Sequence, residues 1–138
     1  MSRCWLMKSE PNTYSIDDLA RDGRTHWDGV RNYQARNVMR EMDVGDRGFF
    51  YHSQTEKAVV GIVEVIAAAH PDSTDDTGKW ECVDIVAVDP LPRPVTLDEV
   101  KAEAALKDMV LANNTRLSVQ PVTAAEWETI LSMAGRPA

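Results

Sequence analysis

The segment Trp27-Asp-Gly-Val-Arg-Asn-Tyr-Gln-Ala-Arg-Asn37 carries the most structural information in this chain of 138 residues. Asp-Gly is a turn signal, because glycine adopts backbone angles that other residues resist. Beyond the turn, apolar residues recur at the spacing of a helix with one buried face: Ala35, Val38, Met39 and Met42. The segment therefore predicts a tryptophan, a turn and a short amphipathic helix, in that order.

Polar side chains crowd around the start of this helix. A helix N-terminus offers unpaired N–H groups and partial positive charge, so such a cluster indicates a ligand site. A capped helix with a solvated polar face would explain the same residues, and this segment alone leaves both interpretations open. Besides Trp27, the residues concerned are Arg31, Asn32, Tyr33, Gln34 and Asn37.

Outward from this segment, period-two patterns and cap signals predict the other elements. We predict strands over residues 3–8, 47–53, 58–69, 80–90 and 116–120, and helices over 15–20, 96–109 and 123–133. The prolines at 90–94 and at 121 are expected to end two of these strands. Strands grouped in mid-chain with helices on the flanks indicate an α+β fold, most simply a small curled β-barrel decorated by helices.

The composition is that of an ordinary folded protein, with 43% hydrophobic and 27% charged residues. No run approaches the roughly 20 apolar residues of a membrane helix, and the N-terminal residues lack the apolar stretch of a signal peptide. The two cysteines, Cys4 and Cys82, are flanked by strand-like residues and are expected to be buried thiols. We therefore expect a single domain over residues 1–138, in the cytoplasm and away from membranes.

The net charge of −7 would ordinarily argue against a nucleic-acid partner. Residues 1–60, however, hold nine basic and nine acidic residues, so the excess negative charge lies entirely in residues 61–138. Contacts with phosphate are therefore expected from the first half of the chain. Such contacts would be few, and binding would depend only modestly on salt.

Several residues suggest catalytic or metal chemistry at first sight. His52 and Ser53 are adjacent on a predicted strand and should point to opposite faces, so they are not expected to form a nucleophile–base pair. An acidic loop after His70 matches neither a zinc spacing nor an EF-hand. The sequence also lacks a glycine-rich phosphate loop, and we expect neither a metal nor a cofactor.

Four residues stand where a ligand could be held. Lys8 and Ser9 lie at the exit of the first strand and could contact a phosphate or a base, although a surface lysine and a turn serine are the simpler interpretation. Trp27 and Trp80 stand beside turn or loop residues. An indole there can stack on a planar base, worth about 1–3 kcal/mol, or can plug one end of a barrel.

Six ordered motifs together resemble the EVE domain family over essentially the whole chain. EVE domains belong to the PUA-like superfold and are related to YTH domains, which bind methylated adenine in RNA. The motifs are Trp5-Leu-Met-Lys-Ser-Glu-Pro11, the Trp27–Asn37 segment, Phe50-Tyr-His-Ser53, Gly61-Ile-Val-Glu-Val65, Trp80 followed by Val83-Asp84, and Leu117-Ser-Val-Gln-Pro121.

The resemblance implies a small β-barrel with a pocket for a modified nucleobase that is flipped out of its strand and held in an aromatic cage. On this basis Trp27 matches one wall of the cage and Trp80 a second. Arg31 would meet the flanking backbone or structure the turn. The remaining residues expected near the pocket are Lys8, Ser9, Asn32, Tyr51 and Ser53. Asp28 and Gly29 depart from the YTH pattern, so a preference for methyladenine does not carry over.

The function that we expect is a non-catalytic module that reads a methylated or hydroxymethylated base in RNA or DNA. A hydrolase of modified nucleosides is one alternative, because the PUA-like ASCH group resembles this fold and Lys8 and Glu10 could serve as base and acid. A small-molecule or protein-binding module is another, and the acidic net charge favours it. The sequence predicts no oligomeric state.

Overall fold

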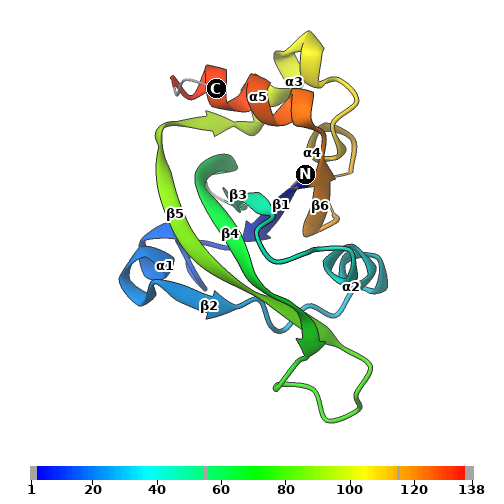
Figure 1. The fold of residues 1–138 in the computed structure, drawn as a ribbon. Coiled ribbons are helices and arrows are strands. Elements are labelled where there is room, and N and C mark those ends of the chain that lie inside the picture. Colours follow the sequence, from blue (N-terminus) through cyan, green and yellow to red (C-terminus); the bar gives the residue numbers. More distant parts are fainter. Residues whose placement is uncertain (1–2, 55, 115, 136–138) are drawn as a thin grey trace.

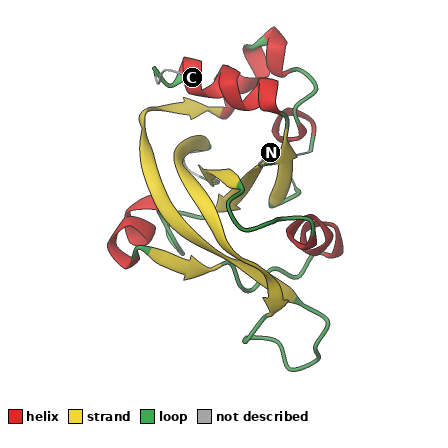
Figure 2. Cartoon of the chain, viewed as in Figure 1, coloured by secondary structure: helices red, strands yellow, loops and turns green. Residues whose placement is uncertain are grey.

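The computed structural model describes residues 3–54, 56–114 and 116–135. One sheet holds six strands, and helices cover it from several directions (Figures 1 and 2). The strands are β1 (Cys4–Ser9), β2 (Arg24–His26), β3 (Arg47–His52), β4 (Ala58–Pro71), β5 (Glu81–Thr96) and β6 (Val119–Val122). The helices are α1 (Ile16–Asp22), α2 (Tyr33–Arg40), α3 (Leu97–Ala102), the 3-10 helix η1 (Ala104–Leu106), α4 (Val110–Asn113) and α5 (Ala124–Met133).

The sheet is curled but not closed. Its order is β2-β5-β4-β3-β1-β6, so among the described residues β2 and β6 form its two edges. β1 runs parallel to β3, and the other neighbours are antiparallel. Register shifts interrupt the β4–β5 pairing at four places, and such bulges increase strand twist. In Figure 1 the long strands β4 and β5 cross the molecule, with α3 and α5 gathered at one end. The α+β fold and the curled sheet are confirmed.

Local capping signals explain where the helices begin. Ser15, Thr96 and Thr123 each accept a hydrogen bond from the backbone N–H three residues later. The acidic side chain at that position in turn accepts a hydrogen bond from the backbone N–H of the cap residue. Asn32 caps α2 by accepting from the N–H of Ala35. The predicted helix over 96–109 is divided, however, into α3 and η1, and α4 begins only at Val110.

Two predicted strand ends were wrong, and one strand was missed. β5 continues through Pro90, Pro92 and Pro94 to Thr96, and β6 includes Pro121. β2 pairs with only residues 84–86 of β5, so the later part of β5 is an edge, as is β6. Proline is tolerated at an edge because the missing N–H removes no ladder hydrogen bond. β2 is three residues long and has no apolar run to reveal it.

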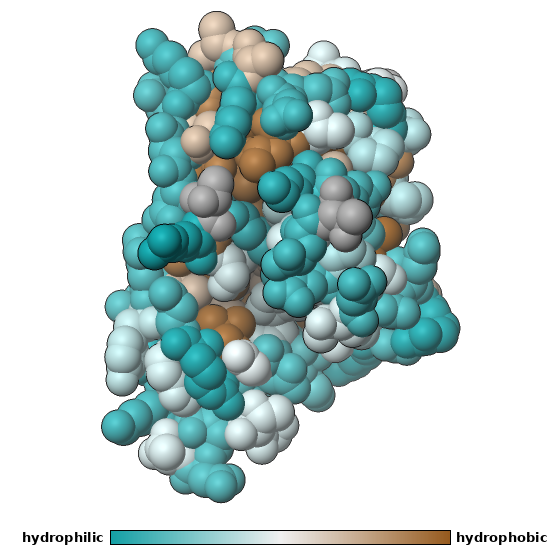
Figure 3. Space-filling model, turned by 180° about the vertical axis from the view of Figure 1, so that it is seen from behind, coloured by the Kyte–Doolittle hydropathy of each residue, from teal (hydrophilic) through white to brown (hydrophobic). Residues whose placement is uncertain are grey.

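Alternation along the strands divides the core between the two sides of the sheet. Trp5 and Met7 of β1 enter a cluster that also contains residues of α1 and α2, whereas Leu6 enters a cluster with residues of α3, η1, α4 and α5. Seen from behind, the surface is mostly hydrophilic, with small hydrophobic areas between hydrophilic side chains (Figure 3). No helix within the described ranges is long and apolar enough to cross a membrane.

The two cysteines are free thiols, as expected. Cys82 is buried and Cys4 is partly buried. Burial raises the pKa of Cys82 to about 11 and also raises the pKa of Cys4. Neither sulfur therefore has the thiolate character of a nucleophile.

Candidate functional site

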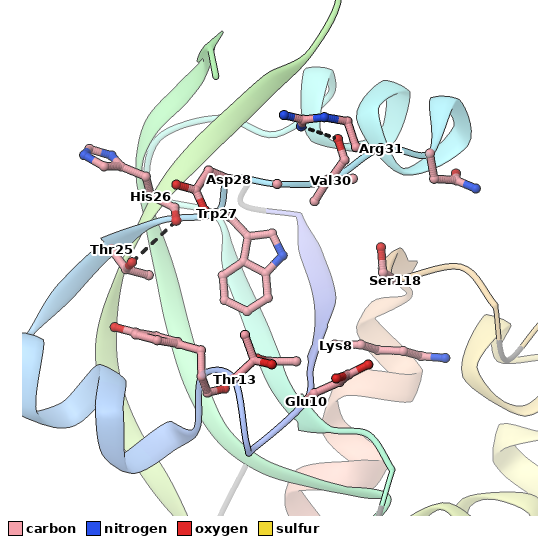
Figure 4. A pocket seen from close by; sticks show the side chains of 14 residues that line it. Lys8, Glu10, Thr13, Thr25, His26, Trp27, Asp28, Val30, Arg31 and Ser118 are labelled. Carbon is pink, nitrogen blue, oxygen red and sulfur yellow. Dashed lines mark hydrogen bonds between the residues drawn. The ribbon is translucent and has the colours of Figure 1, made fainter. Parts of the chain in front are cut away.

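A cavity of about 590 Å³ opens where the end of β1, the approach to α1, β2 and the Trp27 loop meet. Its volume is in the range of small-molecule sites in proteins. Figure 4 shows residues from these separate segments arranged around the Trp27 indole. The lining residues are Lys8, Ser9, Glu10, Thr13, Tyr14, Thr25, His26, Trp27, Asp28, Gly29, Val30, Arg31, Asn32 and Ser118.

Trp27 belongs both to the core and to this cavity. Its side chain is 8% exposed, and its ring meets Phe50 edge to face at 5.6 Å between centroids. Its backbone N–H donates to the carbonyl of Val83 at 2.8 Å, which fixes the strand end. The indole nevertheless points into the middle of the cavity (Figure 4). One part of the ring is therefore held by the core while another faces the open space.

Asp72 holds the loop after Trp27 in place. This buried carboxylate accepts from the N–H of Gly29 at 2.8 Å, from Arg31 at 3.1 Å, and from the N–H and hydroxyl of Thr74. Burial alone would raise the pKa of Asp72, but these hydrogen bonds lower it to about 2. Gly29 has a φ of 77°, which suits glycine at this turn. Arg31 thus structures the turn, one of the two roles expected for it.

Besides Arg31, three polar residues predicted for the site line the cavity. The side-chain oxygen of Asn32 accepts from the N–H of Ala35 at 2.9 Å and so caps α2. The same residue lines the cavity, so it fits both interpretations of this segment. The hydroxyl of Ser9 donates to the carbonyl of Tyr14. Lys8 is half-buried, and this burial lowers the pKa of its ammonium group. The N–H of Lys8 also donates to the carbonyl of Ser118 at 2.8 Å, which joins two sides of the cavity.

Tyr51 and Ser53 lie in a neighbouring hollow rather than in the Trp27 cavity. This hollow has a volume of about 320 Å³ and shares Lys8 with the cavity, and its other lining residues are Tyr51, Ser53, Gln54, Lys57, Leu97 and Lys101. The Lys8 ammonium lies 5.6 Å from the centre of the Tyr51 ring. Burial raises the pKa of Tyr51 to about 12, so its phenol stays protonated and can donate a hydrogen bond.

Trp80, the expected second wall, lies outside the cavity lining. Its ring stacks on Tyr33 at 4.8 Å between centroids, with 29° between the planes. The guanidinium groups of Arg31 and Arg36 each lie 5.7 Å from the centre of the Trp80 ring. Trp80 and Tyr33 therefore form a second aromatic group, separate from the cavity and in contact with Arg31 and Arg36.

Several residues that line the cavity could not be predicted from the sequence, because pairing between distant segments brings them to it. Ser118 reaches the cavity through β6, which pairs with β1. Thr25 and His26 arrive on β2, which carries no sequence signal. Thr13 and Tyr14 lie in the turn that follows Pro11, and no sequence pattern in this turn indicates a ligand site. His52 accepts from the N–H of Ile16 at 3.0 Å, which agrees with a structural role for this histidine.

Comparison with known proteins adds to this geometry. The EVE domain family model matches residues 3–133. Human thymocyte nuclear protein 1 is 37% identical over an alignment that covers 96% of this chain and 74% of that protein. A solved structure from Agrobacterium tumefaciens is 51% identical, with a TM-score of 0.95 and coverage of 98% of this chain and 94% of that one.

Two further solved structures hold a modified nucleic acid. The human THYN1 protein in complex with DNA containing 5-methylcytosine is 36% identical, with a TM-score of 0.92 and coverage of 99% of this chain and 100% of that one. A YTH domain of Zygosaccharomyces rouxii MRB1, in complex with N6-methyladenosine RNA, is 16% identical over 99% of this chain and 89% of that one. Its TM-score of 0.62 shows a shared fold alone.

Proposed function

The chain belongs to the EVE domain family, and on that premise we propose that it is a non-catalytic reader of a modified base, with 5-methylcytosine in DNA as the first candidate. The observation that carries the proposal is the cavity with the Trp27 indole at its centre. The 5-methylcytosine DNA complex of the human relative, similar over the full length of this chain, supports the choice of base.

In this proposal the base leaves its strand and enters the cavity. Trp27 supplies a stacking surface, and the phenol ring of Tyr14 is a further aromatic side chain in the lining. Asn32 and Ser9 supply groups for the polar edge of the base. A methyl group contributes roughly 0.8 kcal/mol when buried, so selectivity depends on its fit against the cavity wall together with the edge hydrogen bonds.

Phosphates that flank the base would lie along the lysine hollow. Lys8 lines both the cavity and the hollow, and Lys57 and Lys101 line the hollow beyond it. Three cationic side chains in this hollow stand out against a net charge of −7. A strand that leaves the cavity past Lys8 would meet them in turn, and each phosphate contact should add about 0.7–0.9 to the salt slope of binding.

The test is a fluorescence-polarisation titration at two salt concentrations. Matched DNA and RNA oligonucleotides differ by a single base: cytosine, 5-methylcytosine, 5-hydroxymethylcytosine or N6-methyladenine. Ser118→Phe should fill part of the cavity, because Ser118 lies in its lining across from Trp27 (Figure 4). Ser132→Phe, the same change at an exposed position of α5, is the matched control.

We expect tighter binding to one modified strand, at least tenfold weaker in Ser118→Phe and unchanged in Ser132→Phe. Equal binding of modified and unmodified strands by the folded protein would refute a reader. Equal weakening in both variants would place the contact outside the cavity. A free nucleoside that binds as tightly as its oligonucleotide would point to a small-molecule module.

One arrangement favours hydrolysis as a second candidate function. Lys8 and Glu10 line the same cavity, and burial lowers the pKa of Lys8, as a general base requires. Incubation with N4-acylated or alkylated cytidines, followed by chromatography, tests it. Turnover that Lys8→Ala abolishes would establish the enzyme, whereas intact nucleosides after long incubation with folded protein would exclude these substrates.

A further inference from the structure

Two imidazole rings and one carboxylate converge on one side of the sheet, next to the cavity. His26 lies on β2, His70 on β4 and Asp84 on β5, the strand between them. The register pairs His26 with Asp84 and pairs His70 with Cys82. Because Cys82 and Asp84 are two residues apart on β5, both histidines share the face that carries Asp84. The three side chains come from positions spread over 58 residues of sequence.

Their nitrogen and oxygen atoms lie close together. Asp84 Oδ1 is 2.6 Å from His26 Nδ1 and 2.8 Å from His70 Nε2, and the three atoms lie within 4.8 Å of one another. A carboxylate oxygen has no proton to offer. A ring nitrogen can approach it this closely when the nitrogen carries a hydrogen and donates it, or when a metal ion lies between the two atoms.

The surroundings of His70 resemble those of a metal ligand. Its other ring nitrogen, Nδ1, lies 3.3 Å from the carbonyl oxygen of Pro71. An Nδ1–H group that donates to this carbonyl leaves the Nε2 lone pair directed at the cluster. Metal-binding histidines are commonly oriented in this way by a backbone carbonyl. Asp84 is 7% exposed, whereas the side chain of His26 is 59% exposed and leaves a path from solvent.

We propose that His26, His70 and Asp84 form a binding site for a divalent first-row transition-metal ion, with Zn²⁺ as the probe. Two imidazoles and one carboxylate suit such ions, and water would complete the coordination. Bonds of about 2.1 Å in a tetrahedral site place ligand atoms about 3.4 Å apart, so each imidazole nitrogen would move less than about 1 Å away from Asp84 Oδ1 to admit the ion.

The site is separate from the proposed reading of bases, but the two are adjacent. His26 also lines the cavity and immediately precedes Trp27. Its imidazole points away from the indole (Figure 4), so a metal ion there would not occupy the base cavity. An ion bound by all three residues would connect β2, β4 and β5 at the point where the Trp27 loop begins.

Zinc binding to untagged, EDTA-treated protein can be measured by competition with a chromophoric chelator. We expect one ion per chain at micromolar zinc or tighter. His70→Gln and Asp84→Asn should each weaken the affinity at least tenfold. Asp76→Asn, which removes an exposed carboxylate from the acidic loop, should leave the affinity unchanged. Circular dichroism without zinc establishes that each variant is folded.

Cobalt substitution gives a second measurement of the same site. Co²⁺ should produce visible absorption in the wild-type protein, and X-ray absorption of the zinc form should show two imidazole ligands. Folded wild-type protein that binds no zinc would overturn the proposal, since a proton would then explain the short contacts. Binding that survives Asp84→Asn and His70→Gln, or that Asp76→Asn weakens equally, would also overturn it.

Discussion

Trp27 and Trp80 both stand beside turn residues, yet the structure uses them differently. Trp27 is 8% exposed, contacts Phe50 edge to face and presents its indole to a cavity. Trp80 stacks on Tyr33, which is 56% exposed, under two arginines. Trp27 follows a strand of the sheet and is held by the Val83 carbonyl, whereas Trp80 ends a loop of polar residues. Both backbones are hydrogen-bonded, since the Trp80 carbonyl also accepts from the N–H of Asp72 at 3.0 Å. The difference lies in what packs against each ring, which is the buried core at Trp27 and the exposed Tyr33 ring at Trp80.

The largest expected effect is that of Trp27→Ala, which removes the buried one of the two tryptophan side chains. Removal of a buried indole should lower the free energy of unfolding by about 3 kcal/mol or more, measured by urea denaturation. Binding of modified DNA should weaken at least tenfold. Trp27→Phe separates the two effects, because it keeps a ring against Phe50. Because a phenyl ring can also stack on a base, a folded Trp27→Phe protein with full affinity would show that the larger face of the indole is not needed for stacking.

Asp72→Asn should have the next largest effect, because it loosens the loop that follows Trp27. A pKa lowered from 3.8 to about 2 corresponds to about 2 kcal/mol of native-state stability. That stability is present above pH 3.8 and disappears as the pH falls toward 2. Urea midpoints measured between pH 2 and pH 6 should therefore converge for wild type and Asp72→Asn at the acid end. A constant difference across this range would contradict the assigned pKa.

Lys8→Gln should have a smaller effect, because it removes a positive charge beside the cavity and leaves both tryptophans in place. Loss of one phosphate contact should weaken binding several-fold for all sequences and reduce the salt slope by about 1. Polarisation titrations from 50 to 200 mM salt measure both quantities. Arg93→Gln, in an ion pair with Glu99 remote from the cavity, is the control. A loss of base preference at unchanged salt slope would instead assign Lys8 to the edge of the base.

Trp80→Ala should have the smallest effect. Stacking on an exposed ring is worth about 1 kcal/mol, so a small loss of stability is expected by thermal denaturation. Affinity for the modified strand should stay within about twofold of wild type. A tenfold loss would break the comparison and make the Tyr33–Trp80 surface a second stacking platform for the strand.

The sequence predicted those features that depend on neighbouring residues. Ser15 and Thr123 revealed their helix starts because a cap and its partner are three residues apart. The Trp27 turn was visible because Asp-Gly follows it directly. Asp72 could not be found in this way, since its bond to Gly29 joins residues 43 positions apart. Trp80 was expected beside Trp27, but loop geometry places it behind Arg31, and no local pattern encodes that geometry.

The position of β1 in the sheet affects the order in which the molecule can assemble. β1 lies between β3 and β6, and Lys8 at its end bonds to the Ser118 carbonyl. A nascent chain that has not yet extended beyond residue 118 lacks both that bond and β6. Until then one hydrogen-bonding edge of β1 is available to other strands, a common starting point for aggregation. A chain truncated before β6 should therefore aggregate more readily than the full-length protein.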